Sequence, residues 1–347
     1  DKLFDRFEFV QAAQEYLQLV EKGNKDGYIC MQLGDSYFNM YNTKEAEIWY
    51  AEAVKSKQDA ETYYRYAQML KSNGKYKESN DQMKVFAAMS SKDERVIEFN
   101  KNPDYLPKLI DKEKLFDINE LNINSDKSDF GAVRYDDVVY FASARNQANK
   151  NYGWNDEPYL DIYQTVINAD GTYSQPSPIT ELNSKFHEGP LTMSKDRSTV
   201  YFSSESFNEK LYEKDKSKRL KYGQVGLYKA VKVNGKWAEI TPLPFNSKSY
   251  STSNPSLSKD DNTLYFSSNM PGSVGGYDIW KVNINSNGTC GKPENLGNKI
   301  NTPGDEGFPF VTDDGVLYFA SNGLTGFGGL DVFLADLNTN SAPINLG

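Results

Sequence analysis

The sequence offers few side chains whose type and spacing could carry out catalysis. It contains a single histidine, His187. A Ser/His/Asp or Cys/His device needs a histidine beside a nucleophile, and a zinc site needs several nitrogen or sulfur ligands. The segment "SLSK" at 256–259 fits the S-x-x-K pattern by letter, but it falls in a predicted strand and turn without companion motifs. We therefore predict no catalytic residue and no metal site, and we interpret His187 and Ser256 as structural or merely exposed.

Carboxylates form the second group of candidates. Glu188, Asp305 and Glu306 precede predicted strands, and pairs of acids recur in predicted turns. Paired carboxylates can hydrolyse glycosides or bind Ca²⁺. Each of these acids occupies a repeated position, so we interpret it as structural. A calcium ion in one of the turns stays an open alternative, and its role would also be structural.

A glycine-rich phrase that occurs twice is the third candidate: "TLYFSSNMPGSVGGYDIW" (263–280) and "VLYFASNGLTGFGGLDVF" (316–333). Such loops cradle phosphates where a strand leads into a helix, and neither phrase has that context. We predict instead a connection between two strands, in which glycine permits φ > 0 and a close approach of backbone, and in which the aspartates accept hydrogen bonds from the turn. The predicted turn residues are Asp161, Gly275, Gly276, Asp278, Gly328, Gly329 and Asp331. No cofactor is predicted.

The composition limits the class of protein. The chain has 347 residues and a formal net charge of −9, which argues against a nucleic-acid surface. No run approaches the roughly 18 apolar residues that a membrane span needs. The 24 tyrosines and 19 phenylalanines suit half-buried sheet surfaces. The sequence begins at Asp1 without a starting methionine, so we expect a mature or trimmed piece, with any export signal or lipid anchor outside it.

Residues 1–100 have the apolar pattern of helices. The stretches 7–20, 41–54 and 74–87 align at a shift of about 34 residues, with small residues at corresponding places. Such a period, with small residues where paired helices touch, resembles the tetratricopeptide repeat, in which each helical hairpin stacks on the next. An unrelated helical bundle remains the alternative.

From residue 118 onward, short β-rich runs alternate with Gly, Pro, Asn, Asp and Ser. One phrase occurs four times, as a strand, an acidic turn and a second strand with paired aromatics at Tyr140/Phe141, Tyr201/Phe202, Tyr265/Phe266 and Tyr318/Phe319. A third strand and a closing fourth phrase follow each copy. Four strands in roughly 53–64 residues, repeated head to tail, are typical of β-propeller blades.

These copies resemble the PD40-type (WD40-like) propeller repeat, most closely at 252–284 and 305–337. Tetratricopeptide-like repeats directly before such a propeller resemble the middle of the OmpA-family envelope proteins of Bacteroidetes, a family that includes a lipoprotein associated with type IX secretion and gliding. The resemblance implies attachment to the outer membrane by a lipid anchor and binding to peptidoglycan through a separate domain; both features lie outside this chain.

The expected fold class is therefore α + β multidomain, with N-terminal helical tetratricopeptide-like repeats followed by an all-β propeller of four-stranded blades. The expected domains are a helical repeat domain at 1–100, a connecting segment at 101–117, and a propeller at 118–347. Four blades are visible, and we expect the ring to continue past the chain end.

Two blades depart from the repeat, at 145–161 and 205–226. Repeat proteins place insertions on a face that often binds partners. The candidate partner-contact residues are Tyr152, Trp154, Tyr159, Tyr212 and Tyr222, residue types that dominate interface hot spots. Ordinary loop variation is the alternative.

The leading functional hypothesis is a non-enzymatic scaffold. The family resemblance implies a periplasmic location and partners among outer-membrane or periplasmic proteins of a secretion or gliding complex. A second hypothesis is a Tol-like periplasmic propeller that binds a peptide or protein in its central channel. A third is the propeller of a hydrolase, which would require a separate catalytic domain.

Overall fold

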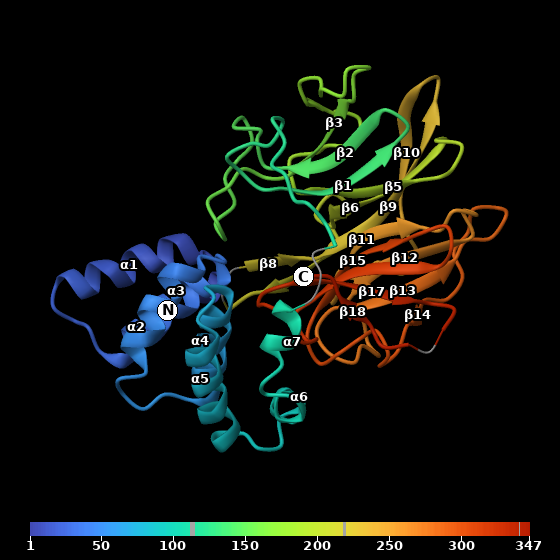
Figure 1. Cartoon of the computed structure of the whole chain (residues 1–347). Helices are drawn as coiled ribbons and strands as arrows, with labels where there is room; N and C mark the ends of the chain where they lie inside the picture. The colour runs from blue at the N-terminus through green and yellow to red at the C-terminus, as the bar shows by residue number, and fades with distance from the viewer. Residues whose placement is uncertain (112–114, 218–219, 340) are drawn as a thin grey trace.

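The computed structural model describes residues 1–111, 115–217, 220–339 and 341–347, in which a helical part precedes four antiparallel sheets (Figure 1). Parts of the predicted connecting segment (112–114) and of the second departure (218–219) lie outside the described residues. The helices are η1 (Phe4–Arg6), α1 (Phe9–Glu21), α2 (Gly27–Asn39), α3 (Thr43–Ala53), α4 (Ala60–Ser72), α5 (Tyr76–Met89), α6 (Glu94–Lys101) and α7 (Leu106–Ile110). None of these described helices combines the length and apolar character needed to cross a membrane.

Small residues let the helices approach one another closely. Ala46 and Ala67 are fully buried between helices. At Gly34 in α2, an added Cβ would stand 2.6 Å from the ring of Tyr50 in α3. The N-termini of α2 and α4 are capped by Asp26 and Asp59. The carboxylate of each aspartate accepts the backbone N–H of the residue three positions later, at 2.9 Å. The small positions singled out in the sequence therefore lie at helix contacts.

Four of the sheets have four strands each, and we call these sheets blades 1 to 4 in chain order; a fifth sheet is a two-stranded hairpin. Blade 1 contains β1 (Asp129–Tyr135), β2 (Val138–Ser143), β3 (Asp161–Val166) and β4 (Ser177–Pro178). Blade 2 contains β5 (Glu188–Met193), β6 (Thr199–Glu205), β9 (Val225–Val233) and β10 (Lys236–Pro242), with the hairpin β7 (Tyr212–Asp215) and β8 (Leu220–Gly223) inserted between β6 and β9. Blade 3 contains β11 (Thr252–Leu257), β12 (Thr263–Ser268), β13 (Asp278–Asn283) and β14 (Glu294–Asn295). Blade 4 contains β15 (Glu306–Val311), β16 (Val316–Ser321), β17 (Asp331–Asp336) and β18 (Ile344–Asn345).

The hydrophobic core of the β part lies between successive blades. Ile162 of blade 1 is buried with Leu191 and Phe202 of blade 2. The cores between blades 2 and 3 and between blades 3 and 4 repeat this arrangement. Each blade therefore covers the face of the blade before it, as in a propeller.

The predicted fold class, tetratricopeptide-like repeats followed by an all-β propeller of four-stranded blades, is wrong as stated. The described residues form seven helices followed by a propeller-like arrangement of four blades. Among these residues no hydrogen bond is found between blades 1 and 4, whose rings Phe130 and Phe308 meet edge to face at 6.0 Å, so the four described blades form an arc.

The outermost strand is only two residues long in blades 1, 3 and 4. The sequence predicts a fourth strand in each of the closing phrases without giving its length. Their apolar residues, such as Ile179 and Leu182, leave the ladder and pack in the core between blades instead. A repeated phrase identifies strands, but it does not state how far the outer strand extends or whether a ring closes.

Candidate binding site

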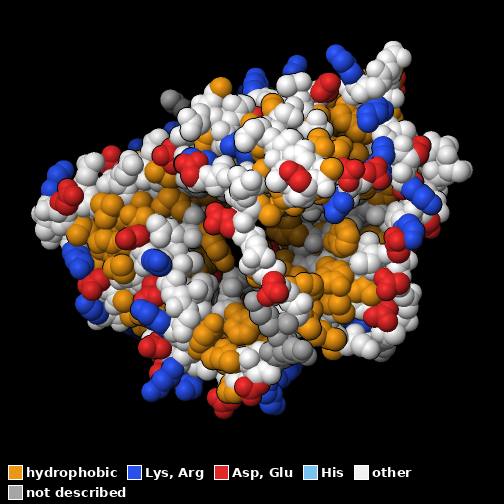
Figure 2. Space-filling view, turned by 45° about the horizontal axis from the view of Figure 1, so that its top comes forward, with side chains coloured by type: hydrophobic (Ala, Val, Ile, Leu, Met, Phe, Trp, Pro, Cys, Tyr) orange, Lys and Arg blue, Asp and Glu red, His pale blue; other side chains and the backbone are white. Residues whose placement is uncertain are grey.

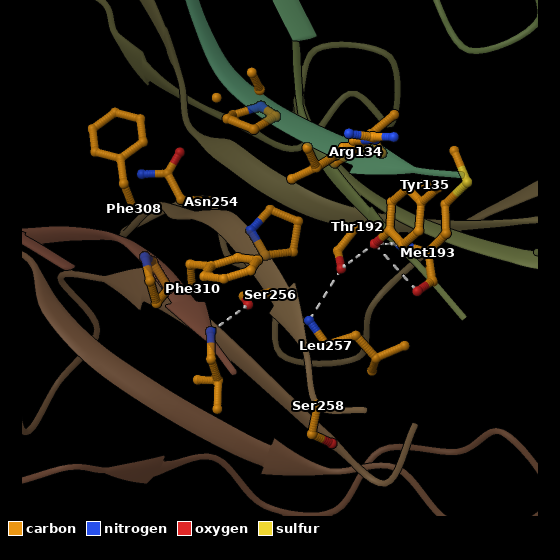
Figure 3. Close-up of a pocket in the computed structure, with 18 of the residues that line it drawn as sticks. Arg134, Tyr135, Thr192, Met193, Asn254, Ser256, Leu257, Ser258, Phe308 and Phe310 are labelled. Carbon is orange, nitrogen blue, oxygen red and sulfur yellow. Dashed lines mark hydrogen bonds between the residues drawn. The ribbon is translucent and has the colours of Figure 1, made fainter. Parts of the chain in front are cut away.

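The first strands of the four blades, β1, β5, β11 and β15, surround a cavity of about 910 Å³. These strands are the inner edges of their sheets. Figure 3 shows their side chains converging on the cavity, with Phe308 and Asn254 at one end and Tyr135 and Met193 at the other. A mostly apolar cavity of this size, with a few polar groups, is typical of binding sites. We therefore treat the central cavity as the candidate site.

A bulge near the start of each first strand shapes the cavity wall. In all four blades the bulge contains a residue with positive φ, at Gly131 (φ 64), Gly189 (φ 99), Asn254 (φ 54) and Phe308 (φ 52). This conformation costs about 1–2 kcal/mol for a residue with a side chain, and such strain concentrates at functional sites. The Phe308 ring is 40% exposed and meets the edge of Phe130 at 6.0 Å. Two aromatic rings thus lie at one end of the cavity.

Hydroxyl groups tie neighbouring inner strands together. The backbone N–H of Leu257 donates to Thr192 Oγ1 at 3.1 Å, and that of Val311 donates to Ser256 Oγ at 3.3 Å (Figure 3). Tyr135 Oη accepts the N–H of Met193 at 2.7 Å in the same way. Ser256, the serine of the S-x-x-K pattern, thus has a structural partner in this arrangement.

The acidic turns after the first strands link each blade to the next. Arg197 of blade 2 forms an ion pair with Asp136 of blade 1 at 2.8 Å. The backbone N–H of Lys195 donates to Asp261 of blade 3 at 3.0 Å, and Lys259 of blade 3 pairs with Asp313 of blade 4. Lys259, the lysine of the S-x-x-K pattern, therefore forms an ion pair with the acidic turn of the neighbouring blade.

The cavity is polarised along the strands. Its start-of-strand end is lined by uncharged side chains, including Phe308, Leu330 and Val332. At the opposite end, near the acidic turns, charged side chains of both signs line the wall: Arg134, Lys195, Arg197, Lys259, Asp261 and Asp313. Among the described residues the Lys195 ammonium has no ion pair, whereas the guanidinium of Arg134 donates to the carbonyl of Asp136 at 2.7 Å and pairs with Asp137 at 3.8 Å. Figure 2 shows apolar side chains gathered around a hollow on one face of the molecule.

The strand-starting carboxylates have structural partners. Glu306 is fully buried and accepts hydrogen bonds from Thr302 N (2.8 Å), Thr302 Oγ1 (2.7 Å) and Ser321 Oγ (2.6 Å). Glu188 makes the equivalent contacts with Ser184. Burial raises the pKa of each carboxyl to about 7, against the lowering effect of its donors. Each carboxylate therefore links, through hydrogen bonds, the first strand of its blade to the chain segment that precedes it.

His187 lies in a closed aromatic setting. Its Nδ1 accepts the backbone N–H of Leu160 at 3.0 Å, and its ring meets Tyr152 and Tyr159 at 4.8 and 4.5 Å. Its Nε2 is buried without a hydrogen-bond partner in the described chain and lies 3.9 Å from Glu205 Oε1. Burial lowers the pKa of His187 to about 4 and raises that of Glu205 to about 7. The neutral imidazole acts here as an acceptor in a packed core.

The His187 environment predicts a pH-dependent stability. Because the folded pKa is about 4 and the ordinary value is 6.5, only the unfolded chain gains a proton as pH falls through this window. We expect the advantage of wild type over His187→Asn in unfolding free energy to shrink by up to about 3 kcal/mol between pH 7 and pH 4. Urea unfolding of both proteins across this range measures the difference. Glu205 is present in both proteins, so its opposite slope largely cancels, and a pH-independent difference would contradict the prediction.

The predicted partner-contact residues of the first departure lie against the chain's own helices. Trp154 stacks on Phe7 at 5.8 Å, meets Phe9 edge-on at 4.8 Å, and donates its Nε1–H to the carbonyl of Asn39 at 2.7 Å. Tyr152 stacks on Trp154. These contacts join blade 1 to α1 and α2. Contact of Tyr152, Trp154 and Tyr159 with another protein stays a prediction.

The second departure forms a hairpin rather than an open loop. Tyr222 in β8 meets the edge of Phe7 at 5.9 Å, so the hairpin touches the same helical residue as Trp154. Tyr212 in β7 packs against Phe207 at 5.7 Å and lies under the ammonium of Lys221. The structure thus brings Trp154 and Tyr222 together around Phe7, and it places Tyr212 apart from them. Partner contact by these tyrosines also stays a prediction.

The paired glycines serve different needs in the two blades. Gly328 (φ +122) and Gly329 (φ +68) have left-handed backbones, and a Cβ on Gly329 would stand 1.8 Å from the Tyr41 hydroxyl of the helical part. Gly275 and Gly276 have no left-handed backbone. A Cβ on Gly276 would instead stand 2.1 Å from Asp305 Oδ1. In blade 3 glycine is required because neighbouring atoms leave no room for a Cβ. In blade 4 it is required both for lack of room and because the backbone has positive φ.

The turn aspartates accept hydrogen bonds from their own loops. Asp278 accepts the N–H groups of Val274 (2.7 Å) and Gly275 (3.3 Å). Asp331 accepts those of Phe327 (2.8 Å) and Gly328 (3.1 Å). Asp161 accepts the side-chain amide of Asn146 at 2.7 Å instead. Across the described ranges, no group of three or more His, Cys, Asp or Glu side chains is placed to hold a metal ion.

The sequence offered a central channel as the second hypothesis but predicted none of its lining residues, because the wall is assembled from strands up to about 180 residues apart in the sequence. One local signal was available. Aromatic or apolar residues follow the bulge in blade 4, where blades 2 and 3 have Thr192 and Ser256. Phe310 at this position is 53% exposed. The equivalent residue of blade 1 is Val133, so the size of the Phe310 ring, rather than the loss of a hydroxyl group alone, distinguishes blade 4 at this position.

No family model matches the sequence. No curated protein matches it either. Solved structures with a similar arrangement include a puromycin-hydrolyzing peptidase of Mycobacterium tuberculosis, with 13% identity, a TM-score of 0.37, and coverage of 64% of this chain and 39% of that chain. They also include a thermostable family-43 glycoside hydrolase, with 10% identity, a TM-score of 0.38, and coverage of 62% and 73%. An alpha-L-arabinofuranosidase from Lactobacillus brevis has 13% identity, a TM-score of 0.37, and coverage of 64% and 71%. The chain spans well under two thirds of the peptidase. At these scores, the activities of these enzymes carry no argument about this chain.

Proposed function

We propose that this chain is a non-enzymatic protein-binding scaffold whose partner enters the central cavity. The observation that carries the proposal is the cavity itself. It is large enough for several side chains, mostly apolar, and lined by exposed aromatic groups such as Phe308 and Phe310. Of the two leading hypotheses from the sequence, this arrangement favours binding in the central channel over binding at the two departures, whose aromatic residues already contact the helices.

The non-enzymatic part of the proposal is supported by the positions of the reactive side chains. Ser256 accepts an inter-blade hydrogen bond, Glu306 holds three donors, and His187 accepts from Leu160. A nucleophile and a base within reach of each other would be needed for acyl transfer. Each of these groups instead stabilises the contact of one segment with the next.

The location and the class of partner come from the repeat resemblance. We propose a place in the bacterial cell envelope, with partners among outer-membrane or periplasmic proteins of a secretion or gliding complex. A rigid body suits this role, because Trp154 and Tyr222 hold the helices against the blades and leave the cavity and the helical part as separate surfaces.

Photo-cross-linking from inside the cavity tests this proposal. A benzophenone amino acid at Phe310, introduced into the full chain in its native cells, is expected to form a discrete protein adduct in the envelope fraction. The same group at Ile48, an exposed position on α3, is the matched control and should not form that adduct. Equal adducts at both positions, or none at Phe310, would refute binding in the cavity. An adduct found only outside the envelope fraction would refute the proposed location.

A further inference from the structure

We propose that the hairpin β7–β8 carries a docking surface for anionic lipid headgroups, the lysine face, formed by Lys214, Lys216 and Lys221 beside the ring of Tyr212. The hairpin is inserted between β6 and β9 of blade 2, and no other blade has an equivalent sheet among the described residues. None of these four side chains lines the central cavity, so the lysine face is a second surface, independent of the proposed cavity binding.

The register of the hairpin places two lysines directly opposite each other. Lys214 in β7 pairs with Lys221 in β8, next to the pair Tyr212–Gly223 on the same face. Both ammonium groups lie over the Tyr212 ring, at 5.7 and 4.8 Å from its centroid. Like charges at directly opposite positions destabilise a strand pair. The ring attracts each cation but carries no net charge. The hairpin therefore holds two cations together without neutralising them.

Strand alternation puts the acids of the hairpin on its other face. Glu213 and Asp215 flank Lys214 along β7, so their side chains point away from the lysine face. Glu213 accepts a hydrogen bond from Ser249 Oγ at 3.1 Å, and Tyr222 on the same face contacts the helical part. Within the parts of the chain that the structure describes, no lysine of the lysine face forms an ion pair. The acids thus face the body of the protein and leave the lysine face positively charged.

The openness of the lysine face favours a membrane as its partner. Lys214, Lys216 and Lys221 are exposed, and Tyr212 is half-buried at the base of the hairpin. Exposed cations on a strand pair do not enclose a single small anion, but they complement an extended anionic surface, where each lysine strengthens binding by a factor of about five. Tyrosine is also enriched at the level of lipid headgroups. The net charge of −9 disfavours a nucleic acid, which would meet acidic surface beyond the hairpin.

Vesicle flotation at low salt tests this surface. The full chain is mixed with vesicles of phosphatidylcholine, or of phosphatidylcholine with about one third phosphatidylglycerol, and we expect binding only to the anionic vesicles. The double variant Lys214→Gln/Lys221→Gln is expected to bind about twentyfold more weakly, because two lysines each contribute a factor of about five. Lys232→Gln/Lys236→Gln is the matched control. It removes the same charge from exposed lysines of the hairpin β9–β10, where Lys232 also lies over an aromatic ring, at 4.9 Å, and it should leave binding within about twofold of wild type.

Several results would overturn the assignment of the lysine face to lipid headgroups. Equal binding to both kinds of vesicle, or to neither, would remove the preference for anionic lipid. Equal losses in the two double variants would show that binding follows the net charge and not the hairpin. Displacement from the vesicles by soluble glycerol 3-phosphate would assign the lysines to single phosphate groups, and capture by polyglutamate without binding to vesicles would assign them to an acidic polypeptide.

Thermal unfolding of the same variants separates docking from a structural role. Lys214→Gln/Lys221→Gln removes a repulsion between opposite residues, so we expect its unfolding midpoint to equal or exceed that of wild type. A lower midpoint would show that the two lysines stabilise the hairpin instead. All of these results are independent of cross-linking at Phe310, so the lysine face and the cavity are tested separately.

Discussion

Replacement of Trp154 by alanine is expected to loosen the helical part from the blades and to cost up to about 3 kcal/mol of stability, the lower end of the range for a core aromatic, because the ring is only partly buried. The ring contacts Phe7 and Phe9, and the indole N–H satisfies the carbonyl of Asn39. Loss of the indole leaves that carbonyl without its donor as well as leaving a cavity. Calorimetry is expected to show separate transitions for the helices and the blades where wild type has one, and hydrogen exchange in α1 and α2 should rise.

Two control variants distinguish loss of the contact between helices and blades from a general loss of stability. Trp154→Phe keeps an aromatic ring but not the N–H, so it should lose less stability than alanine and keep a single transition. Trp237→Phe, within the blade 1–blade 2 core, should lower the transition temperature without separating the transitions. A Trp154→Ala protein that unfolds in one transition at the wild-type temperature would show that these rings do not hold the two parts together.

Replacement of Glu306 by alanine is the second change with a large expected effect. It leaves three donors, from Thr302 N, Thr302 Oγ1 and Ser321 Oγ, without their acceptor in a fully buried site. Leaving a buried donor without its acceptor costs about 1–3 kcal/mol, and three donors lose theirs here, so we expect a loss of at least about 3 kcal/mol. Glu306→Gln keeps the shape and one acceptor oxygen, so it should lose markedly less. Urea unfolding at pH 7 compares the three proteins.

The size of the alanine effect also tests the role of this carboxylate. If Glu306 were a surface acid or a free catalytic group, its removal would change stability by less than about 0.5 kcal/mol. If it fastens blade 4 to the segment before it, hydrogen exchange should rise selectively in β15 and β16. A uniform small change over the whole chain would contradict the fastening role.

The positions of strands and turns could be predicted from the sequence, but the segments that they contact could not. The repeated aromatic phrases coincide with β2, β6, β12 and β16, because alternation and turn residues are local properties. The aspartates at 278 and 331 bind their own turns for the same reason. Trp154 was identified as a contact residue from its type, but its type cannot distinguish a partner protein from the chain's own helix α1.

The features that the sequence did not predict depend on contacts between segments far apart in the chain. The closing phrases have strand-like composition, yet Ile179 and Leu182 serve the core between blades. The reason that Gly276 must be glycine lies in Asp305, a residue of the next blade. The cavity requires four strands to come together, and no window of sequence contains more than one of them. These features depend on packing between segments distant in sequence, which periodicity does not encode.

The helices contact both ends of the arc of blades. They contact blade 1 through Trp154, and they contact blade 4 at Gly329, where the Tyr41 hydroxyl approaches the backbone. The helical part therefore bridges the first and the last of the four described blades without contributing a residue to the cavity wall. We expect substitutions at either contact, Trp154 or Tyr41, to alter the spacing of blades 1 and 4, and with it the width of a cavity that the helices do not line.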